Sequence, residues 1–387
     1  MPACTCTNPT ILFTIISYHK YSVYQPPDFK SQFLMAIPSL TQNSSSYIEG
    51  GDEQTLFNKE KEDGSDQILS VLPRERGWLS EHIHLYQGFW YSTGVLKGLL
   101  ILQKHFWAKP SDILLATYPK SGTTWLKALL FTITNRTCIS HPDQNPLLTA
   151  NPHELVPMLE SYAAANPVNP KPPNSLMHTH IPYTSLPEST KSSGCHIVYV
   201  YRDPKDVLVS CWHFVNKLKP EAVPRISLAE TFEKFSKGVS PYGPYWNHVL
   251  GYWKASIEWP ERVFFIRYED LKKEPCFQTK RLAEFLGMPF TTDKEGESLV
   301  RKVVDFCSFK NLSNLDVNKT GSHSGFGFPV IENKIFFREG QVGDSQNYLE
   351  REMMDHLDQV TEEKFKKFHL KTFSLEDDEK SEVSIAM

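Results

Sequence analysis

The stretch DILLATYPKSGTTWLKALLFTITN, residues 112–135, most constrains what this chain can fold into. Its first part, 112–119, is an apolar run bounded by Ser-Asp and by Pro, which is typical of a buried strand. A Ser-Gly-Thr-Thr turn follows, and residues 125–135 have the pattern of a helix. The N–H groups in the first turn of such a helix have no partner within it, so they can bind an anion. The stretch predicts a strand, a P-loop-like anion-binding loop and a helix.

Two further apolar runs predict strands at HIVYVYR (196–202) and RVFFIRY (262–268). Each is followed by a helical pattern, at 206–218 and 269–286. Strands that alternate with helices predict βαβ units and an α/β fold, here a single domain with a central parallel sheet flanked by helices. Right-handed crossovers place the carboxyl ends of the strands at one edge of the sheet, where ligands bind.

The remaining segments divide into predicted helices, loops and termini. Helices are expected at 95–106 and 350–368, and long loops, often lids in compact domains, at 165–175 and 318–334. The polar, weakly periodic residues 1–65 predict a disordered extension, and 373–387 a disordered acidic tail. The folded domain is therefore expected to span 66–372.

Composition narrows the class of protein. The net charge is −4 and no long basic tract occurs, so nucleic acid is not an expected partner. No apolar run is long enough to span a membrane; ILFTII at 11–16 is far too short. The seven cysteines lack zinc spacing and favour reduced thiols in a cytoplasmic protein. The first 46 residues fit a plastid-type transit peptide only loosely, and the favoured interpretation is a dispensable extension with Met35 as the natural start.

The glycine turn has the chemistry of a phosphate site. Gly122 lets backbone approach a ligand, Thr123 and Thr124 add hydroxyls, and Lys120 adds a positive charge. The indole of Trp125 offers a flat face to a base. The lysine precedes the glycine, unlike that of the nucleoside-triphosphate loop, and no carboxylate ends the predicted strands as a metal ligand. The loop therefore indicates an anion held without a metal, although a plain strand, turn and helix cap remains the alternative for these residues alone.

Several motifs in a fixed order make the resemblance specific. The segments are YPKSGTTW (118–125), MHTHIPY (177–183), VYVYRDPKDVLVSCWHF (198–214), RYEDLKKEP (267–275), FCSFKNLSNLDVNKTG (306–321) and FFREGQVGD (336–344). Together they resemble the cytosolic sulfotransferases over about Leu72 to Phe368. LPRERGW (72–78) and NPHELVP (151–157) are most similar to the plant branch. The resemblance implies an enzyme that moves sulfonate from 3′-phosphoadenosine 5′-phosphosulfate (PAPS) to a hydroxyl of a small acceptor.

The resemblance also implies roles for individual residues. His180 is the expected base, since an imidazole near its ordinary pKa of about 6.5 suits proton removal at neutral pH. Lys120 is expected to stabilise the leaving oxygen. The other donor-binding positions that the family motifs imply are Ser121, Gly122, Thr123, Thr124, Trp125, Arg202, Ser210, Tyr268, Cys307, Phe309, Arg338, Glu339 and Gly340.

The chain departs from the family pattern at four places. Glu339 replaces the lysine of the family's Arg-Lys-Gly, and Ser345 replaces the tryptophan of its Gly-Asp-Trp. His178 stands where animal members have a lysine. The animal dimer motif is not visible near 318–334, which leaves the oligomeric state open.

These departures favour a second hypothesis, that the chain is a catalytically weakened nucleotide-binding homologue. A kinase on the same fold is a third. The acceptor is expected in an aromatic-walled pocket near Trp212, His213 and Phe214, and the plant branch suggests flavonols, steroids, hydroxylated jasmonates or desulfoglucosinolates.

Overall fold

The computed structural model describes residues 65–137, 142–325 and 328–370. The predicted disordered segments 1–65 and 373–387 fall outside these residues, apart from Ser65. The strands are β1 Arg74–Arg76, β2 His82–Tyr86, β3 Phe89–Ser92, β4 Ile113–Thr117, β5 Leu176–Thr179, β6 His196–Tyr201, β7 Val263–Arg267, β8 Ser322–Gly325 and β9 Phe328–Glu332.

The helices, in chain order, are α3 Ser65–Val71, α4 Thr93–His105, α5 Thr123–Asn135, α6 Pro152–Leu155, α7 Leu159–Ala165, α8 Glu188–Ser192, α9 Pro204–Leu218, α10 Leu228–Ser236, α11 Tyr245–Glu258, α12 Tyr268–Lys273, α13 Pro275–Phe285, α14 Lys294–Phe306, α15 Phe309–Leu312, α16 Asp316–Lys319 and α17 Arg351–Lys366.

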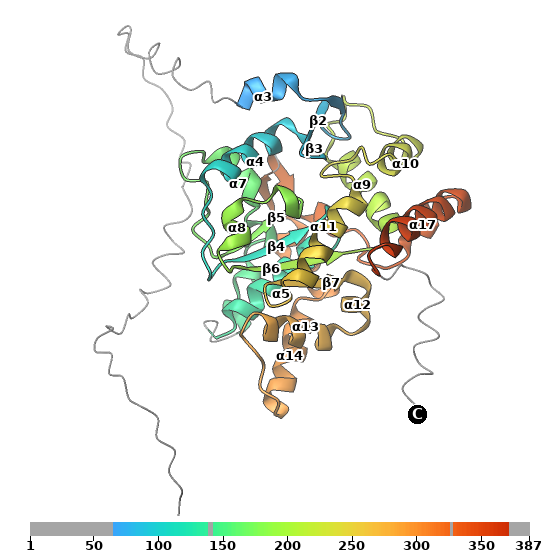
Figure 1. The fold of residues 1–387 in the computed structure, drawn as a ribbon. Helices are drawn as coiled ribbons and strands as arrows, with labels where there is room; N and C mark the ends of the chain where they lie inside the picture. The colour runs from blue at the N-terminus through green and yellow to red at the C-terminus, as the bar shows by residue number, and fades with distance from the viewer. Residues whose placement is uncertain (1–64, 138–141, 326–327, 371–387) are drawn as a thin grey trace, which may run out of the picture. The chain divides into compact units, whose positions relative to one another are not determined.

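A four-stranded parallel sheet in the order β5-β4-β6-β7 lies at the centre of the described domain (Figure 1). This confirms the predicted α/β class. The chain leaves β4 toward β5 on one side, and it leaves β6 toward β7 on the other. The carboxyl ends of β4 and β6 therefore lie at a topological switch point, where open α/β sheets bind ligands. The glycine turn follows β4, and Arg202 follows β6.

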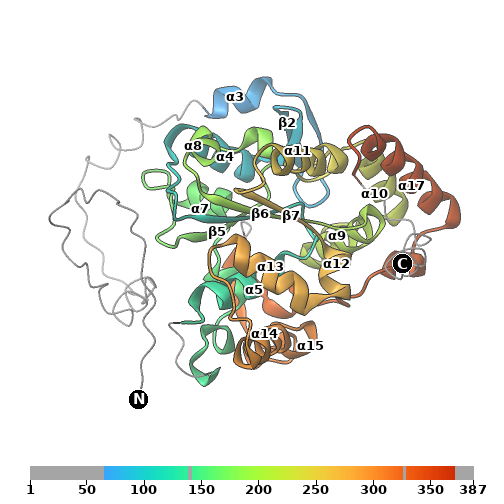
Figure 2. The ribbon, with the colours of Figure 1, turned by 60° about the horizontal axis from the view of Figure 1, so that its bottom comes forward.

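Alternate residues of the central strands enter two separate cores. In β4, Leu114 and Ala116 pack into a core that includes α4, α9 and α11 residues, whereas Ile113 and Leu115 face a core built with α5, α13 and α14 residues. Both faces of the sheet are thus covered, which explains why the strands read as continuous apolar runs. Figure 2 shows α4 and α11 on one side of the sheet and α5 and α13 on the other.

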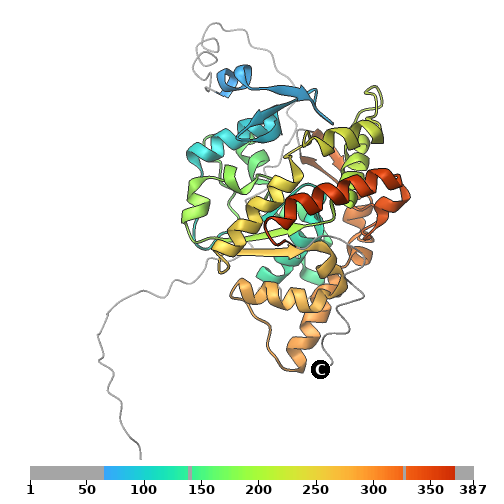
Figure 3. The ribbon, with the colours of Figure 1, turned by 45° about the vertical axis from the view of Figure 1, so that its right-hand side comes forward.

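The C-terminal amphipathic helix is confirmed as α17. In Figure 3 it lies, in red, across the yellow α11. The contact includes a hydrogen bond of 2.9 Å from the Trp246 indole N–H to the Thr361 hydroxyl. Helix α17 therefore covers one side of the core that contains α11.

Three predictions of local structure were wrong or incomplete. The helix expected at 269–286 is broken into α12 and α13, because Pro275 begins α13 and cannot continue the preceding helix. The loop expected at 318–334 contains α16 and the antiparallel hairpin β8–β9, paired at His323 with Ile331. The strand β5 and the antiparallel sheet β1-β2-β3 were not predicted.

Candidate active site

The glycine turn after β4 contains two residues with a left-handed backbone. Lys120 and Gly122 adopt left-handed φ angles of 70° and 112°, and α5 begins at Thr123. A Cβ on Gly122 would lie 2.7 Å from the ring of Tyr268, so this position needs glycine for space as well as for conformation. The N–H groups at the start of α5 remain available to an anion.

A cavity of about 290 Å³ brings together the predicted donor-binding residues, which come from segments far apart in the sequence. All of them line it except Ser121, which is buried. Gly340 packs closely against Phe309 in the cavity wall, because a Cβ at residue 340 would lie 2.5 Å from the Phe309 ring. Lys272, which was not predicted, also lines the cavity and donates to the Gly340 carbonyl at 3.0 Å. Cationic and aromatic groups thus share the walls.

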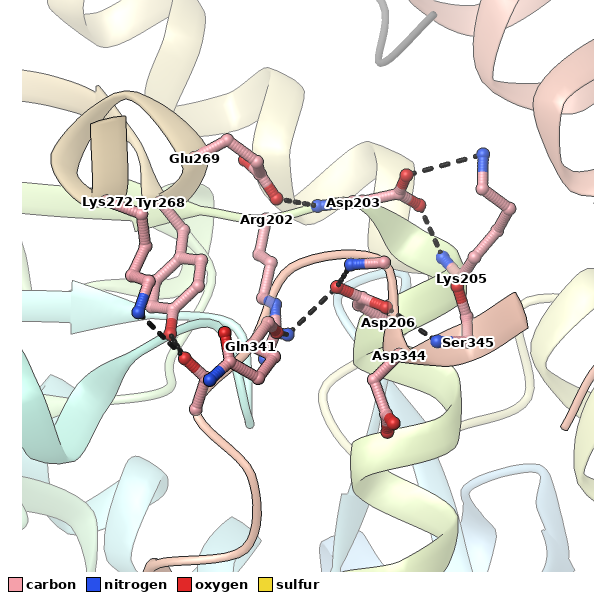
Figure 4. A network of polar contacts seen from close by, with 12 residues as sticks. Arg202, Asp203, Lys205, Asp206, Tyr268, Glu269, Lys272, Gln341, Asp344 and Ser345 are labelled. Carbon is pink, nitrogen blue, oxygen red and sulfur yellow. Dashed lines mark hydrogen bonds and ion pairs between the residues drawn. The ribbon is translucent and has the colours of Figure 1, made fainter. Parts of the chain in front are cut away.

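Arg202 is held by a buried ion pair. Its guanidinium lies 2.9 Å from Asp206 Oδ2, stacks 4.6 Å from the centre of the Tyr268 ring, and donates to the Gln341 carbonyl (Figure 4). The same Asp206 carboxylate accepts the N–H groups of Gly343 and Ser345, both at 2.9 Å. Asp206 therefore connects α9 to the 338–345 segment. Sequence reasoning missed it, although it is the second Asp of the R-D-P-K-D motif.

His180 follows β5 and is buried, with 8% of its surface exposed. Its Nδ1 lies 2.7 Å from the Thr117 carbonyl oxygen. Because a carbonyl oxygen only accepts, Nδ1 carries the hydrogen and Nε2 carries the lone pair. Burial lowers the pKa of His180 to about 3, so the expectation of an ordinary pKa near 6.5 was wrong. The ring is neutral at pH 7 in the tautomer that a base requires.

A buried carboxylate supports the backbone of His180. Glu160 of α7 accepts the His180 N–H at 2.9 Å, the Thr179 hydroxyl at 2.8 Å and the Tyr242 hydroxyl at 3.0 Å. Desolvation raises the pKa of Glu160. In addition, His248 Nε2 lies 2.8 Å from the His180 carbonyl oxygen. These contacts fix the chain where β5 ends, and the sequence offered no local signal for either partner.

Lys120 lines the same cavity as His180. Its ammonium stands 3.9 Å from the centre of the Phe214 ring, a cation–π contact. Burial lowers the pKa of Lys120 to about 8, which leaves the side chain mostly charged at pH 7. His178 does not supply a second cation there. It is fully buried on β5, its ring centre 4.4 Å from that of His180, and burial lowers its pKa well below the usual value.

A second cavity of about 770 Å³ adjoins the first. The residues lining both are Pro119, Lys120, His180 and Phe214. Most of its other walls are apolar or aromatic, including Trp78, Trp90, Tyr91 and Tyr242. Of the three aromatic residues expected near the acceptor, Phe214 lines this cavity, whereas Trp212 and His213 do not. Trp212 turns away and donates to the Ile226 carbonyl, and His213 packs against Tyr348.

The residues 110–369 match the family model of the sulfotransferase domain. The chain is also 46% identical to cytosolic sulfotransferase 12 of Arabidopsis thaliana over 309 residues, which cover 79% of this chain and 92% of that protein. The chain belongs to the sulfotransferase family. Its expected reaction class, transfer of sulfonate from PAPS to a small acceptor, is confirmed.

Solved structures of other sulfotransferases have the same fold as this chain. A candidate steroid sulphotransferase from Arabidopsis thaliana is 39% identical and matches with a TM-score of 0.62 over 85% of this chain and all of that one. A mouse sulfotransferase solved with PAP, the donor product 3′,5′-bisphosphate, is 26% identical, with a TM-score of 0.57 over 73% of this chain and 94% of that one.

The plant relative is named a cytosolic enzyme, in line with the expected location. None of the helices in the described residues is long and apolar enough to cross a membrane. The same residues contain no group of three or more His, Cys, Asp or Glu side chains arranged to hold a metal ion.

Proposed function

We propose that this sulfotransferase binds PAPS in the 290 Å³ cavity and a flat, largely apolar hydroxylated acceptor in the 770 Å³ cavity. The observation that carries the proposal is that Lys120 and His180 line both cavities. A hydroxyl reaching from the acceptor side meets the base and the cation at the place where the sulfonate must cross. The proposed catalytic domain is residues 66–372.

The walls of the first cavity fit the donor. Trp125 and Phe309 offer apolar surface to the adenine, and Arg202, Arg338 and Ser210 offer positive charge and a hydroxyl to the 3′-phosphate. The turn of Lys120 to Thr124 faces the 5′-phosphate. These side chains come from the positions that the family motifs imply, and apart from Ser121 they all line the same cavity.

His180 and Lys120 divide the chemistry. Nε2 of His180 removes the hydroxyl proton as the acceptor oxygen forms a bond to sulfur. The bond from sulfur to the bridging oxygen of the 5′-phosphate breaks in line, and Lys120 stabilises the negative charge that develops on that oxygen. The hydrogen bond from Nδ1 to the Thr117 carbonyl keeps the imidazole correctly oriented and stabilises it once protonated.

A panel assay tests this function. The full chain is incubated with labelled PAPS, with EDTA present, and with a flavonol, a steroid, a hydroxylated jasmonate or a desulfoglucosinolate, while PAP binding is measured by calorimetry. We expect tight PAP binding and transfer to at least one acceptor class. Absence of PAP binding would overturn the proposal.

The second candidate, a weakened homologue, rests on Glu339. This carboxylate is exposed and lines the donor cavity, where negative charge opposes a bisphosphate. PAP binding without transfer to any acceptor of the panel would favour that reading over the enzyme.

A further inference from the structure

A buried lysine lies directly behind the phosphate turn. Lys127 of α5 is fully buried, an uncommon state for lysine. Its ammonium lies 2.8 Å from the Val156 carbonyl oxygen and 3.1 Å from Nδ1 of His153. Nε2 of His153 lies 3.0 Å from the hydroxyl oxygen of Thr124. These contacts form a chain from the interior to the donor cavity, because both His153 and Thr124 line that cavity.

When Lys127 is charged, the hydrogen bonds that link Lys127, His153 and Thr124 all run in one direction. An ammonium group only donates, so Nδ1 of His153 accepts and the ring hydrogen resides on Nε2. That N–H donates to the Thr124 oxygen. The hydroxyl hydrogen of Thr124 is therefore turned away from His153 and is free to point into the cavity.

If these hydrogen bonds ran in the opposite direction, they would disfavour an anion in the donor cavity. Without a donor at Lys127, His153 can carry its hydrogen on Nδ1, and the Thr124 hydroxyl can then donate to Nε2. Thr124 would present only lone pairs to the cavity and repel a phosphate oxygen. We propose that Lys127 and His153 are positioning residues that orient the Thr124 hydroxyl to donate to the phosphate of PAPS; this inference rests on the proposed donor cavity.

The surroundings of Lys127 allow the charged form. Burial lowers its pKa to about 7, whereas the carboxylate of Glu160 on α7 acts to raise it. His153 and His178 also face it, and burial lowers the pKa of both, so they are neutral at pH 7. A bound phosphate adds negative charge nearby and favours the ammonium further.

A double-mutant cycle tests the direct link. Lys127→Met keeps side-chain length and volume but removes the donor, and Thr124→Val removes the hydroxyl. Each single change is expected to weaken PAP binding about tenfold, the scale for one hydrogen bond to a charged group. The double variant is expected to bind no more weakly than Thr124→Val alone, and the KM for the acceptor is expected to stay unchanged. Lys97→Met on α4 changes a partly exposed lysine that lines neither cavity, and this control should bind PAP normally.

A pair at position 153 keeps the test decisive if Lys127→Met does not fold. Glutamine can accept from Lys127 with its oxygen and donate to Thr124 with its nitrogen, whereas leucine can do neither. His153→Gln should retain most PAP affinity, and His153→Leu should lose about tenfold. Equal losses in both, or multiplied losses in the double variant, would overturn the inference. Failure of the unmodified chain to bind PAP would instead overturn the proposed function.

Discussion

At the scale of single residues, the tautomer of His180 decides what this side chain can do. Nδ1 of His180 donates to the Thr117 carbonyl, so Nε2 is the nitrogen that can act as a base. Removal of the imidazole takes away this base and leaves the proposed donor-binding side chains in place. His180→Ala is expected to lower turnover by roughly 10²–10⁴-fold, the range for a general base. PAP binding, measured by calorimetry, should be nearly unchanged. Turnover close to that of the unmodified chain would show that another group takes the proton.

Glu339 provides a second test at this scale. Its exposed carboxylate lines the donor cavity, and Glu339→Lys replaces repulsion of the phosphates by attraction. PAP affinity at low salt should rise roughly tenfold. The gain should shrink as salt increases, because ions screen exposed charges. Equal affinity at low salt would mean that Glu339 points away from the phosphates and would remove the main reason for the weakened-homologue reading.

At the scale of elements, the 338–345 segment depends on helix α9. Asp206 holds it through the N–H groups of Gly343 and Ser345 and also pairs with Arg202. Asp206→Ala leaves a buried guanidinium without its carboxylate, which costs about 3–5 kcal/mol when one partner of a buried pair is removed. We expect chemical denaturation to show a loss of that size, together with weaker PAP binding.

The control for that change is Arg351→Ala, which breaks an exposed pair with Asp355 on α17. Exposed pairs contribute no more than about 1 kcal/mol. If both variants lost the same small amount, the buried pair would not anchor the segment.

At the scale of the whole molecule, buried neutral histidines link stability to pH. Burial lowers the pKa of His180 to about 3 and that of His248 to about 4, while unfolded histidine titrates near 6.5. Between about pH 4 and 6.5 the unfolded chain binds protons that the folded chain does not. Stability contributed by these groups is therefore present above pH 6.5 and falls as pH decreases, by up to about 1.4 kcal/mol per pH unit for each histidine.

Three buried carboxylates act in the opposite direction. Burial raises the pKa of Asp203 to about 6 and that of Glu269 to about 7, and it also raises the pKa of Glu160, so all three favour folding as pH falls. They are outnumbered in the described residues, because the pKa values of His153 and His178 are lowered as well. We expect the free energy of unfolding to be lower at pH 5 than at pH 7 in urea titrations. Equal or greater stability at pH 5 would contradict this balance.

Much of the fold and the candidate site could be predicted because the signals were local. Apolar runs bounded by turn residues predicted β4, β6 and β7 within about two residues of their ends, and a glycine turn predicted the start of α5. Strand β5 was missed because Leu176–Thr179 is short and contains His178. The hairpin β8–β9 was missed because both strands are short and the glycines in the segment favoured a loop.

The sequence by itself determined the alternation of strands β4, β6 and β7 with helices, the glycine turn after β4 and the residue types that line the proposed donor cavity. Only the tertiary structure decided which partners those residues have. Asp206 meets Gly343 across 137 residues of chain, and His180 meets Thr117 across 63. It also decided the charge states, since burial moves the pKa of His180 to about 3 and that of Lys120 to about 8. Desolvation and hydrogen bonding depend on neighbours in space, which local pattern does not contain.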